Sequence, residues 1–314
     1  TQNEVFKTPV NKIRLFEHGA PGSQNLKLTR KYYTEDMPDG RVKHIVQNIT
    51  DPDMVPYIPD GIGNSTDRQR IPAVLIIPGG AFRRLVYNFE GEDVAKWLNS
   101  MGIAAFVLEC RLPSDEHDNA EDVPLIDAMR AMRVIRGRAQ EFGIDEAKIG
   151  VMGFSAGGFM AALLSTAYES DVYADYKYKD EYDKLSARPD FAVCSYPVIS
   201  IDDCIEAGKR YMSEEQVLER ISDSKAKILH KYNPDKLVRP DMPPVFICET
   251  DDDRTTLSEN SVGFYMAARK AGVSAELHIF RTGGHGYGCG DDFAQTGEWK
   301  VLFTKWIKSI GIIS

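Results

Sequence analysis

The chain of 314 residues has few of the features that mark membrane or nucleic-acid-binding proteins. No apolar run approaches the roughly 20 residues that a membrane-spanning helix needs. Lys and Arg number 38 against 47 Asp and Glu, which gives a formal net charge of −9, and no basic cluster stands out. Nucleic-acid-binding proteins usually carry a basic patch. We therefore expect a soluble protein with neither a membrane segment nor a nucleic-acid partner.

Cysteine is also scarce. The five cysteines make an odd number without paired spacing, which predicts neither a disulfide framework nor a zinc site. Three of them, Cys110, Cys194 and Cys248, lie in strand-like apolar runs and are expected to be small buried hydrophobic residues. No metal and no cofactor is expected.

Internal repeats and low-complexity segments are absent as well. The composition, with 43% hydrophobic and 27% charged residues, is typical of globular proteins. The first residue, Thr1, is not a methionine, which indicates either a removed signal peptide or a trimmed start.

Short apolar runs alternate with helical stretches from residue 71 onward. The runs are nearly continuous in Val, Ile, Leu, Ala and Phe, which is typical of strands covered on both faces of a parallel sheet. They lie at residues 73–77, 103–108, 148–152, 191–196, 245–248 and 275–280. The helices expected between and after them lie at residues 91–101, 124–142, 258–271 and 298–310. In the last of these, an aromatic stripe at helical spacing favours core packing over a ligand site.

The pattern predicts one doubly wound, mostly parallel α/β sheet, and residues 1–314 are expected to form a single domain. The less regular N-terminal 70 residues are expected to supply antiparallel edge strands near residues 12–17 and 41–48. Residues 61–67 are polar and favour an exposed loop. Residues 202–244 interrupt the alternation and are expected to form an insertion at the carboxyl end of the strands.

The sequence Gly153-Phe154-Ser155-Ala156-Gly157 directly follows one of the apolar runs. A serine between two glycines at this spacing is typical of a nucleophile elbow, a sharp strand-to-helix turn that lifts the hydroxyl above the sheet. The N–H groups at the start of the following helix would face the same site. Short Gly/Ser patterns also arise by chance at turns, so this interpretation depends on finding a base, an acid and oxyanion donors.

Of the three histidines that follow Ser155, His285 is the best candidate for the base. It lies in a glycine-rich loop just after the last predicted strand, whereas His230 lies in the insertion and His278 inside that strand. A surface-loop histidine is the alternative. In the α/β-hydrolase order, the acid and then the histidine follow the serine.

The acid is expected after the strand at 245–248, where Asp251, Asp252 and Asp253 follow one another. We favour Asp253, then Asp252. The run also suits a solvated turn or a helix N-cap, and it lacks the alternating ligand pattern of a cation loop. Oxyanion donors are expected from the backbone N–H groups of Gly80, Ala81 and Ala156.

Together these residues resemble the α/β-hydrolase superfamily, and within it the acetyl xylan esterases and related carbohydrate esterases. The resemblance spans about residues 71–310. It is carried by the oxyanion segment 78–82, Glu90-Gly91-Glu92, the segment 108–113, Asp127-Ala128-Met129-Arg130-Ala131, the elbow, Tyr196-Pro197 and Met242-Pro243-Pro244. It implies Ser155 as nucleophile, His285 as base and Asp253 as the acid.

The chain departs from the family pattern at three places. Glu249 replaces a histidine, Thr256-Leu257 replaces Val-Pro, and Ala81 replaces a third glycine. The methyl group of Ala81 is expected to narrow the space beside the acyl group. Phe82, Arg83 and Tyr87 are candidate substrate contacts near the oxyanion loop. Tyr173, Tyr176, Tyr178 and Tyr182 would either stack on sugar rings or, as we favour, pack at the sheet edge.

The resemblance implies a serine esterase that removes acetyl or similar short acyl groups from carbohydrate through an acyl-serine intermediate. The substrate would be a small-molecule or polysaccharide ester, and this class favours a secreted or periplasmic protein over a cytoplasmic one. The same residues would also suit an aryl ester, a formamide or a short peptide. A catalytically inactive hydrolase fold that serves as a binding module is the alternative from another class.

Overall fold

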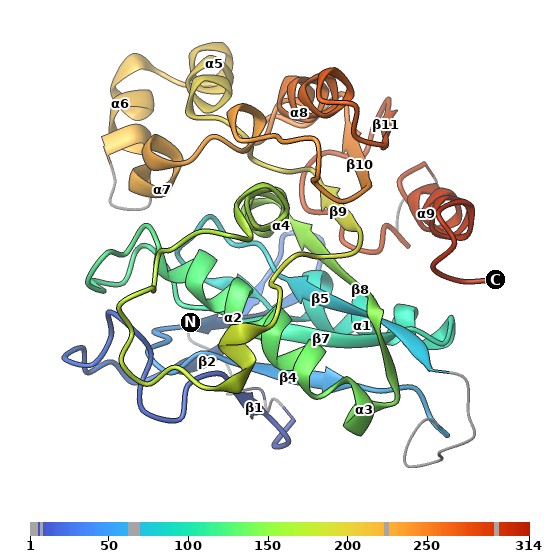
Figure 1. The fold of residues 1–314 in the computed structure, drawn as a ribbon. Coiled ribbons are helices and arrows are strands. Elements are labelled where there is room, and N and C mark those ends of the chain that lie inside the picture. Colours follow the sequence, from blue (N-terminus) through green and yellow to red (C-terminus); the bar gives the residue numbers. More distant parts are fainter. Residues whose placement is uncertain (1–5, 7–8, 62–69, 223–225, 292–294) are drawn as a thin grey trace.

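The computed structural model describes residues 6, 9–61, 70–222, 226–291 and 295–314. Its centre is an eight-stranded sheet in the order β1-β4-β7-β5-β8-β9-β10-β11 (Figure 1). Strands β7 through β11 and β5 are mutually parallel, whereas β1 and β4 run antiparallel to their neighbours. In sheet order the strands are β1 (Ile13–Arg14), β4 (Asp53–Tyr57), β7 (Ala104–Glu109), β5 (Ile71–Ile77), β8 (Ile144–Phe154), β9 (Ala192–Ser195), β10 (Val245–Thr250) and β11 (Ala275–Phe280).

The predicted α/β sheet is therefore confirmed. Strands β7, β9 and β10 are buried along their whole length, as expected for strands covered on both faces. The buried cysteines Cys110, Cys194 and Cys248 lie in or next to these strands, as predicted.

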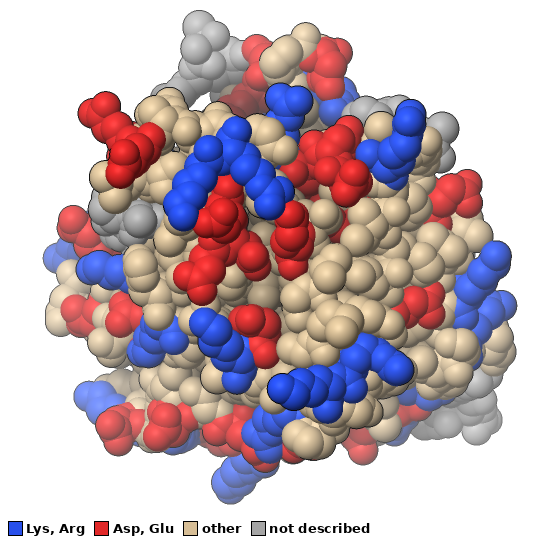
Figure 2. All heavy atoms as spheres, turned by 90° about the horizontal axis from the view of Figure 1, so that it is seen from above, with Lys and Arg blue, Asp and Glu red and all other residues tan. Residues whose placement is uncertain are grey.

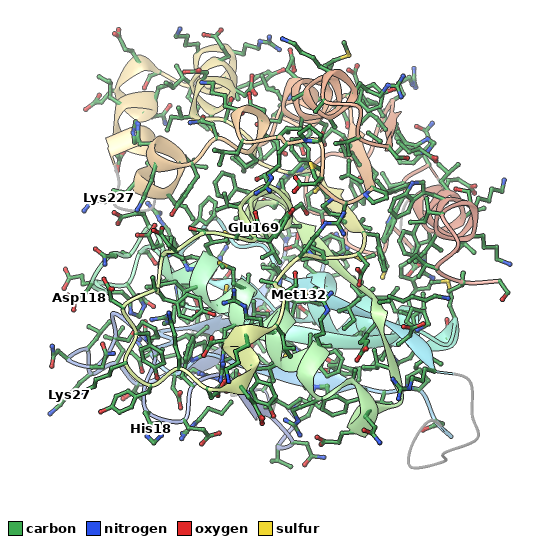
Figure 3. All side chains as sticks on the ribbon, viewed as in Figure 1. His18, Lys27, Asp118, Met132, Glu169 and Lys227 are labelled. Carbon is green, nitrogen blue, oxygen red and sulfur yellow. The ribbon has the colours of Figure 1, made fainter. Side chains whose placement is uncertain are left out.

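Helices cover both faces of the sheet. Helices α1 (Asp93–Ser100) and α9 (Glu298–Ser309) pack against each other, with the rings of Trp97 and Trp299 5.0 Å apart. Helix α1 lies in the connection from β5 to β7, which runs in one direction along the sheet. Three helices lie in connections that run in the other direction: α2 (Val123–Gly137), α4 (Ala156–Ala167) and α8 (Ser258–Lys270). Because such connections are right-handed, these three helices lie on the other face of the sheet. In Figure 3, Met132 of α2 lies in the interior, whereas Lys27 and Asp118 point outward.

The predicted helix at 124–142 is two helices. α2 ends at Gly137, and a short α3 (Ala139–Phe142) follows after Arg138 leaves helical geometry at φ −103° and ψ 13°. A side chain at Gly137 would lie 2.3 Å from the ring of Tyr182, so this end of α2 must be glycine to pack on the neighbouring 3-10 turn η2 (Glu181–Lys184). Gly143 ends α3 with φ 68°, as the stop signal predicted.

The N-terminal region is more extensive than predicted. The segment expected at 12–17 supplies the edge strand β1. The segment expected at 41–48 instead lies in a separate antiparallel sheet of β2 (Lys31–Asp36), β3 (Val42–Gln47) and β6 (Leu85–Val86). We did not predict β2, β4 or β6. Of the loop expected at 61–67, residues 62–67 lie outside the described part of the chain.

The insertion between β9 and β10 consists of α5 (Ile201–Tyr211), α6 (Glu214–Ser222), α7 (Ala226–Lys231) and the 3-10 turn η3 (Pro234–Lys236). It lies beside the carboxyl ends of the parallel strands, near α4 and α8 (Figure 1). Seen from the side of this insertion, acidic and basic side chains are interspersed over the surface (Figure 2). No helix in the described ranges is long and apolar enough to cross a membrane.

Candidate active site

Ser155 occupies a strained turn between β8 and α4. Its backbone has φ 56° and ψ −118°, a conformation that costs a non-glycine residue of order 1–3 kcal/mol. The flanking glycines make the turn possible, because a side-chain carbon at Gly153 would lie 1.9 Å from the carbonyl oxygen of Gly157, and one at Gly157 would lie 1.9 Å from that of Ile77. The turn therefore has the geometry of the predicted nucleophile elbow.

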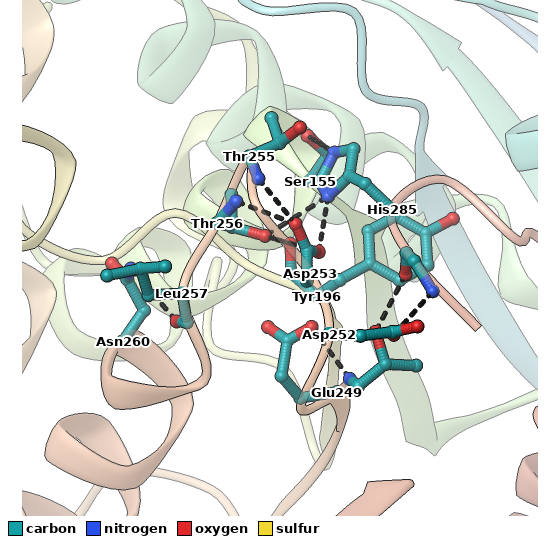
Figure 4. Close-up of polar contacts among 12 residues, drawn as sticks. Ser155, Tyr196, Glu249, Asp252, Asp253, Thr255, Thr256, Leu257, Asn260 and His285 are labelled. Carbon is teal, nitrogen blue, oxygen red and sulfur yellow. Dashed lines mark hydrogen bonds and ion pairs between the residues drawn. The ribbon is translucent and has the colours of Figure 1, made fainter. Parts of the chain in front are cut away.

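Ser155, Asp253 and His285 each follow the carboxyl end of a parallel strand. Their side chains lie together in one group of polar contacts (Figure 4). His285 Nε2 lies 2.8 Å from Ser155 Oγ, and His285 Nδ1 lies 2.6 Å from Asp253 Oδ2. The three residues come from the β8–α4 turn, the loop after β11 and the loop after β10. Of the three histidines considered, His285 is the one that reaches Ser155; His278 Nε2 lies 2.7 Å from Glu276 Oε1 instead.

Asp253 is held as an ionised, oriented carboxylate. Oδ1 accepts hydrogen bonds from the backbone N–H groups of Thr255 (2.7 Å) and Thr256 (2.9 Å), and Oδ2 accepts one from the Thr256 hydroxyl (2.9 Å). Burial by itself would raise the pKa of this carboxyl. The hydrogen bond and charge of His285, together with the two backbone donors, outweigh burial and lower the pKa below its usual value.

Asp252, the second candidate for the acid, has another partner. Its Oδ1 accepts the backbone N–H of Gly284 at 2.8 Å, and the Thr250 hydroxyl donates to the Gly284 carbonyl at 2.8 Å. These two contacts fix the loop that carries His285, while Asp253 fixes its ring.

Glu249, which stands where the family pattern has histidine, is fully buried at the end of β10. Oε1 accepts the N–H of Thr250 at 2.9 Å. Burial raises the pKa of Glu249 well above its usual value, and the neighbouring Asp253 carboxylate raises it further. The raised pKa favours the neutral form of Glu249, which places no second negative charge beside Asp253.

Two of the predicted oxyanion donors, Gly80 and Ala81, line a pocket together with Ser155, and the third, Ala156, directly follows it in the chain. Gly80, Ala81 and Phe82 all have positive φ (139°, 57° and 60°), so the loop after β5 follows a strained path. Within the described ranges, the N–H groups of Gly80, Ala81 and Ala156 donate to no other protein group. Ala156 is the first residue of α4, where N–H groups have no partner inside the helix. Donors of this kind are available to an anionic oxygen.

Comparison with known proteins places this geometry in a family. The profile of the BD-FAE family matches residues 62–267, more than half of the chain. The chain belongs to the BD-FAE family. The crystal structure of an acetyl ester-xyloside bifunctional hydrolase from Caldicellulosiruptor lactoaceticus superposes on this BD-FAE chain with a TM-score of 0.70. It is 35% identical and covers 96% of this chain and 97% of its own.

More distant solved structures share the fold. A carboxylesterase from Lactobacillus plantarum has a TM-score of 0.68 at 20% identity and covers 91% of this chain and 99% of its own. An esterase from Thermogutta terrifontis has a TM-score of 0.65 at 23% identity and covers 94% of this chain and 96% of its own. The BD-FAE chain thus has the α/β-hydrolase fold, as the sequence predicted.

Two curated relatives are much longer than this BD-FAE chain. An acetylxylan esterase of Xylanibacter ruminicola is 31% identical over 240 residues, which cover 76% of this chain and 45% of that protein. The endo-1,4-beta-xylanase B of Butyrivibrio fibrisolvens is 29% identical over 269 residues, which cover 83% of this chain and 40% of that protein. The chain therefore spans less than half the length of either relative.

Ser155 lies between two pockets. The first is mostly apolar, and its empty volume of about 560 Å³ includes space open to solvent. One wall of this pocket comes from the insertion, with Ile201, Cys204, Ala226 and Leu229. The rest of its lining includes Ala81, Phe82, Val198, Thr255 and Thr256. The second, of about 840 Å³, contains His285 and Gly286 and is walled by Met37, Arg41, Lys43, Arg84, Phe89 and Glu90. The small β2-β3-β6 sheet thus supplies one wall of this second pocket.

The candidate substrate residues have different positions. Phe82 lines the apolar pocket and is almost buried, with its ring edge-on to Phe159. Arg83 is exposed and lines neither pocket, whereas the next residue, Arg84, lines the second. Tyr87 is 1% exposed, and its hydroxyl lies 3.0 Å from that of Tyr57, so its assignment as a substrate contact is not supported. We could not foresee this inward orientation from sequence.

The four tyrosines after α4 lie away from both pockets. Tyr173 and Tyr176 pack edge-on against Phe16, with ring centroids 6.4 and 5.5 Å apart, and Tyr182 packs on Gly137. Tyr178 is 42% exposed and lies beside His18. The structure therefore confirms the packing that we favoured for Tyr173, Tyr176 and Tyr182, but not for the exposed Tyr178.

The sequence analysis did not identify three residues of the site, which are Thr256, Tyr196 and Glu90. The Thr256 hydroxyl donates to Asp253 and lies 3.1 Å from His285 Nδ1. Tyr196 packs its ring 5.0 Å from that of His285, and its hydroxyl donates to Glu90 at 2.9 Å. Tyr196 and Glu90 stood in segments that carried the family resemblance, which was the available signal. Within the described residues, no group of three or more His, Cys, Asp or Glu side chains is arranged to hold a metal ion.

Proposed function

We propose that this chain is a serine carboxylesterase that removes acetyl and other short acyl groups from carbohydrate through an acyl-serine intermediate. The observation that carries the proposal is the continuous hydrogen-bonded line from Ser155 Oγ through His285 to Asp253, with distances of 2.8 and 2.6 Å. Such a line lets a weakly acidic hydroxyl act as a nucleophile. The names of the relatives at 31% and 35% identity support a carbohydrate acetyl ester as substrate.

In the first half-reaction, Ser155 Oγ attacks the ester carbonyl carbon and passes its proton to His285 Nε2. The carbonyl oxygen gains a negative charge, and the N–H groups of Gly80, Ala81 and Ala156 would donate hydrogen bonds to that oxygen. The intermediate then collapses. The bond to the alcohol oxygen breaks, and His285 gives its proton to that oxygen, which leaves as the sugar hydroxyl.

In the second half-reaction, water takes the place of the alcohol. His285 removes a proton from the water, the resulting hydroxide attacks the acyl carbon, and the bond to Ser155 Oγ breaks with return of the proton. The products are the carboxylic acid and the free serine. Asp253 keeps the imidazole in one orientation and stabilises its cationic form in both halves.

The two pockets orient the ester. The alcohol oxygen must lie within reach of His285 Nε2, so the sugar belongs in the pocket that contains His285 and Gly286. The acyl group then points into the apolar pocket on the other side of Ser155. Because this pocket is lined mostly by apolar side chains and extends from Ser155 to the insertion, it favours a second candidate activity on longer acyl esters.

Acetate release from acetylated xylo-oligosaccharides, compared with hydrolysis of para-nitrophenyl acetate and butyrate, tests the proposal. We expect turnover of all three substrates, with kcat/KM for the oligosaccharide at least comparable to that for the aryl acetate. Turnover of aryl esters alone would contradict a carbohydrate ester as the substrate, but it would agree with the esterase activity itself. No turnover of any ester would contradict the enzyme and favour a binding module on the same fold.

A further inference from the structure

Glu90 is a buried carboxyl group beside Ser155 that has no part in the mechanism above. It lies in a π-helical turn (Asn88–Glu92) before α1, is 5% exposed, and lines the pocket that contains His285. A buried carboxyl that is only a packing residue costs desolvation energy, so its partners decide what it does. Both of its oxygens have partners on the loops of the active site.

The first partner is the oxyanion loop. The backbone N–H of Gly79 donates to Glu90 Oε2 at 2.8 Å. Gly79 is wedged at this place, because a side-chain carbon there would lie 2.7 Å from Glu90 Oε2 and 2.9 Å from Ser155 Cβ. Glu90 therefore fixes the residue that directly precedes the oxyanion donor Gly80, at contact distance from the nucleophile.

The second partner is the loop that carries His285. The Tyr196 hydroxyl donates to Glu90 Oε1 at 2.9 Å and accepts the backbone N–H of Gly288 at 3.0 Å. Tyr196 is fully buried, and its ring packs edge-on against that of His285. Through one tyrosine, Glu90 is thus connected to the segment three residues beyond the base.

The groups around Glu90 offset part of the effect of its burial. Burial raises the pKa of Glu90 above its usual value, and His285, the Tyr196 hydroxyl, the Gly79 N–H and Lys43 counter only part of this rise. Arg41 and Arg84 line the same pocket. Both oxygens act as acceptors, as a carboxylate requires. An imidazolium that forms on His285 during the reaction favours the ionised form of Glu90 and would then face its negative charge as well as that of Asp253.

We propose that Glu90 is a positioning residue that ties the oxyanion loop to the histidine loop and whose negative charge stabilises the cationic form of His285. The inference rests on the proposed esterase function. Its two parts are separable. Tyr196 takes part only in the connection between the loops, whereas Glu90 supplies both the connection and the charge.

Glu90→Gln tests both parts, because the amide keeps the size but loses the charge and one acceptor. With para-nitrophenyl acetate we expect kcat to fall about 100-fold, in the range seen when an oxyanion donor is lost, while KM stays within about threefold. The acid limb of the kcat/KM pH profile should move to lower pH, because the imidazolium has lost a neighbouring negative charge and deprotonates more readily.

Tyr196→Phe keeps the ring that packs on His285 and removes the hydroxyl. We expect it to lower kcat without moving the acid limb, and the double variant to lose less than the product of the two single losses, as members of one network do. Glu92→Gln is the matched control: Glu92 lies two residues further on and pairs with Lys96 on the surface at 2.9 Å. It should keep wild-type kcat.

The inference is overturned if folded Glu90→Gln and Tyr196→Phe both keep kcat within threefold of wild type. An unmoved acid limb in Glu90→Gln would overturn the electrostatic part even if kcat falls. If Glu90→Gln does not fold, the Tyr196→Phe result alone decides the connection. Inactive wild-type protein would instead contradict the esterase function itself, so the two failures are distinguishable.

Discussion

His285 Nδ1 lies 2.6 Å from Asp253 Oδ2, whereas Asp252, one residue earlier, accepts the backbone N–H of Gly284. Two adjacent aspartates thus support the same loop in different ways, one through the imidazole ring and one through the backbone. The chemistry assigned to each follows from this difference, and it can be tested in a matched pair of variants.

Asp253→Asn should reduce kcat by about 10³- to 10⁴-fold, because the amide no longer supplies a charge and orients the imidazole wrongly. Asp252→Asn keeps an oxygen that can accept the Gly284 N–H, and it should retain kcat within about tenfold. Steady-state hydrolysis of para-nitrophenyl acetate at pH 7.5 measures both. Equal losses in the two variants would contradict the assignment of Asp253.

The apolar pocket predicts the acyl-chain preference. Cys204 on α5 and Ala226 on α7 line it, so Cys204→Phe and Ala226→Leu should fill it. We expect each to lower kcat/KM for para-nitrophenyl butyrate at least tenfold while the acetate value changes little, since a lost methylene contact is worth about 1–3 kcal/mol. Leu218→Phe, at an exposed position of α6, is the control and should leave both values unchanged. Parallel losses on both esters would place the acyl chain elsewhere.

Asp122 anchors the insertion to the core. Its carboxylate lies 2.6 and 2.7 Å from Lys231 Nζ, at the end of the helix that carries Ala226 and Leu229 into the pocket, and it also accepts the Tyr232 hydroxyl. Asp122→Asn should loosen this wall and raise KM for butyrate esters by about three- to tenfold, as expected from losing a charged hydrogen bond worth roughly 1 kcal/mol or more.

Asp202→Asn serves as its control, because Asp202 pairs with Lys236 in an exposed contact of 3.8 Å. Exposed pairs contribute little, so KM should not change. An unchanged KM in Asp122→Asn would show that this anchor does not shape the pocket.

His117 predicts a sensitivity of the fold to acid. Burial, and secondarily Arg111, lower the pKa of His117 to about 4, and its Nδ1 lies 2.9 Å from Ser23 Oγ. The unfolded chain binds a proton near pH 6.5, whereas the folded protein does so only near pH 4. The contribution to stability is therefore present above pH 6.5 and is lost as the pH falls toward 4.

At pH 5 this linkage costs the wild type about 2 kcal/mol of unfolding free energy relative to pH 8. His117→Asn cannot take up a proton, so urea unfolding should show a smaller loss for it by about that amount. Between pH 7.5 and 8.5 the two proteins should change in parallel. If wild type and His117→Asn differ in unfolding free energy by the same amount at pH 5 and at pH 8, His117 is not the source of the acid sensitivity.

The elements nearest the nucleophile were predictable because their signals are local. A strand, a Gly-x-Ser-x-Gly turn and a helix within 24 residues, Ile144 to Ala167, define the elbow by sterics alone. The glycine-rich segment around His285 and the aspartates after β10 follow the chain order of the fold. These residues therefore lie in the structure where the sequence pattern predicted them.

Strand β4 was not predictable in the same way. It contains Pro56, which normally argues against a strand. The structure accommodates it because β1 pairs only with Asp53 and Met54, so one edge of β4 is open at the proline. The orientation of Tyr87 and the connection of Glu90 to Tyr196 likewise depend on segments 30 and 106 residues away along the chain. Such contacts have no periodic or local signature.

The proposed esterase mechanism depends most on the covalent step at Ser155. The wild type is mixed with para-nitrophenyl acetate, quenched in acid within the first turnovers, digested and analysed by mass spectrometry. We predict an acetyl group on the peptide that contains Ser155, and loss of both the acetyl group and ester turnover in Ser155→Ala. Undiminished turnover in Ser155→Ala, or an acetyl group on another residue that forms and decays at the rate of turnover, would contradict it.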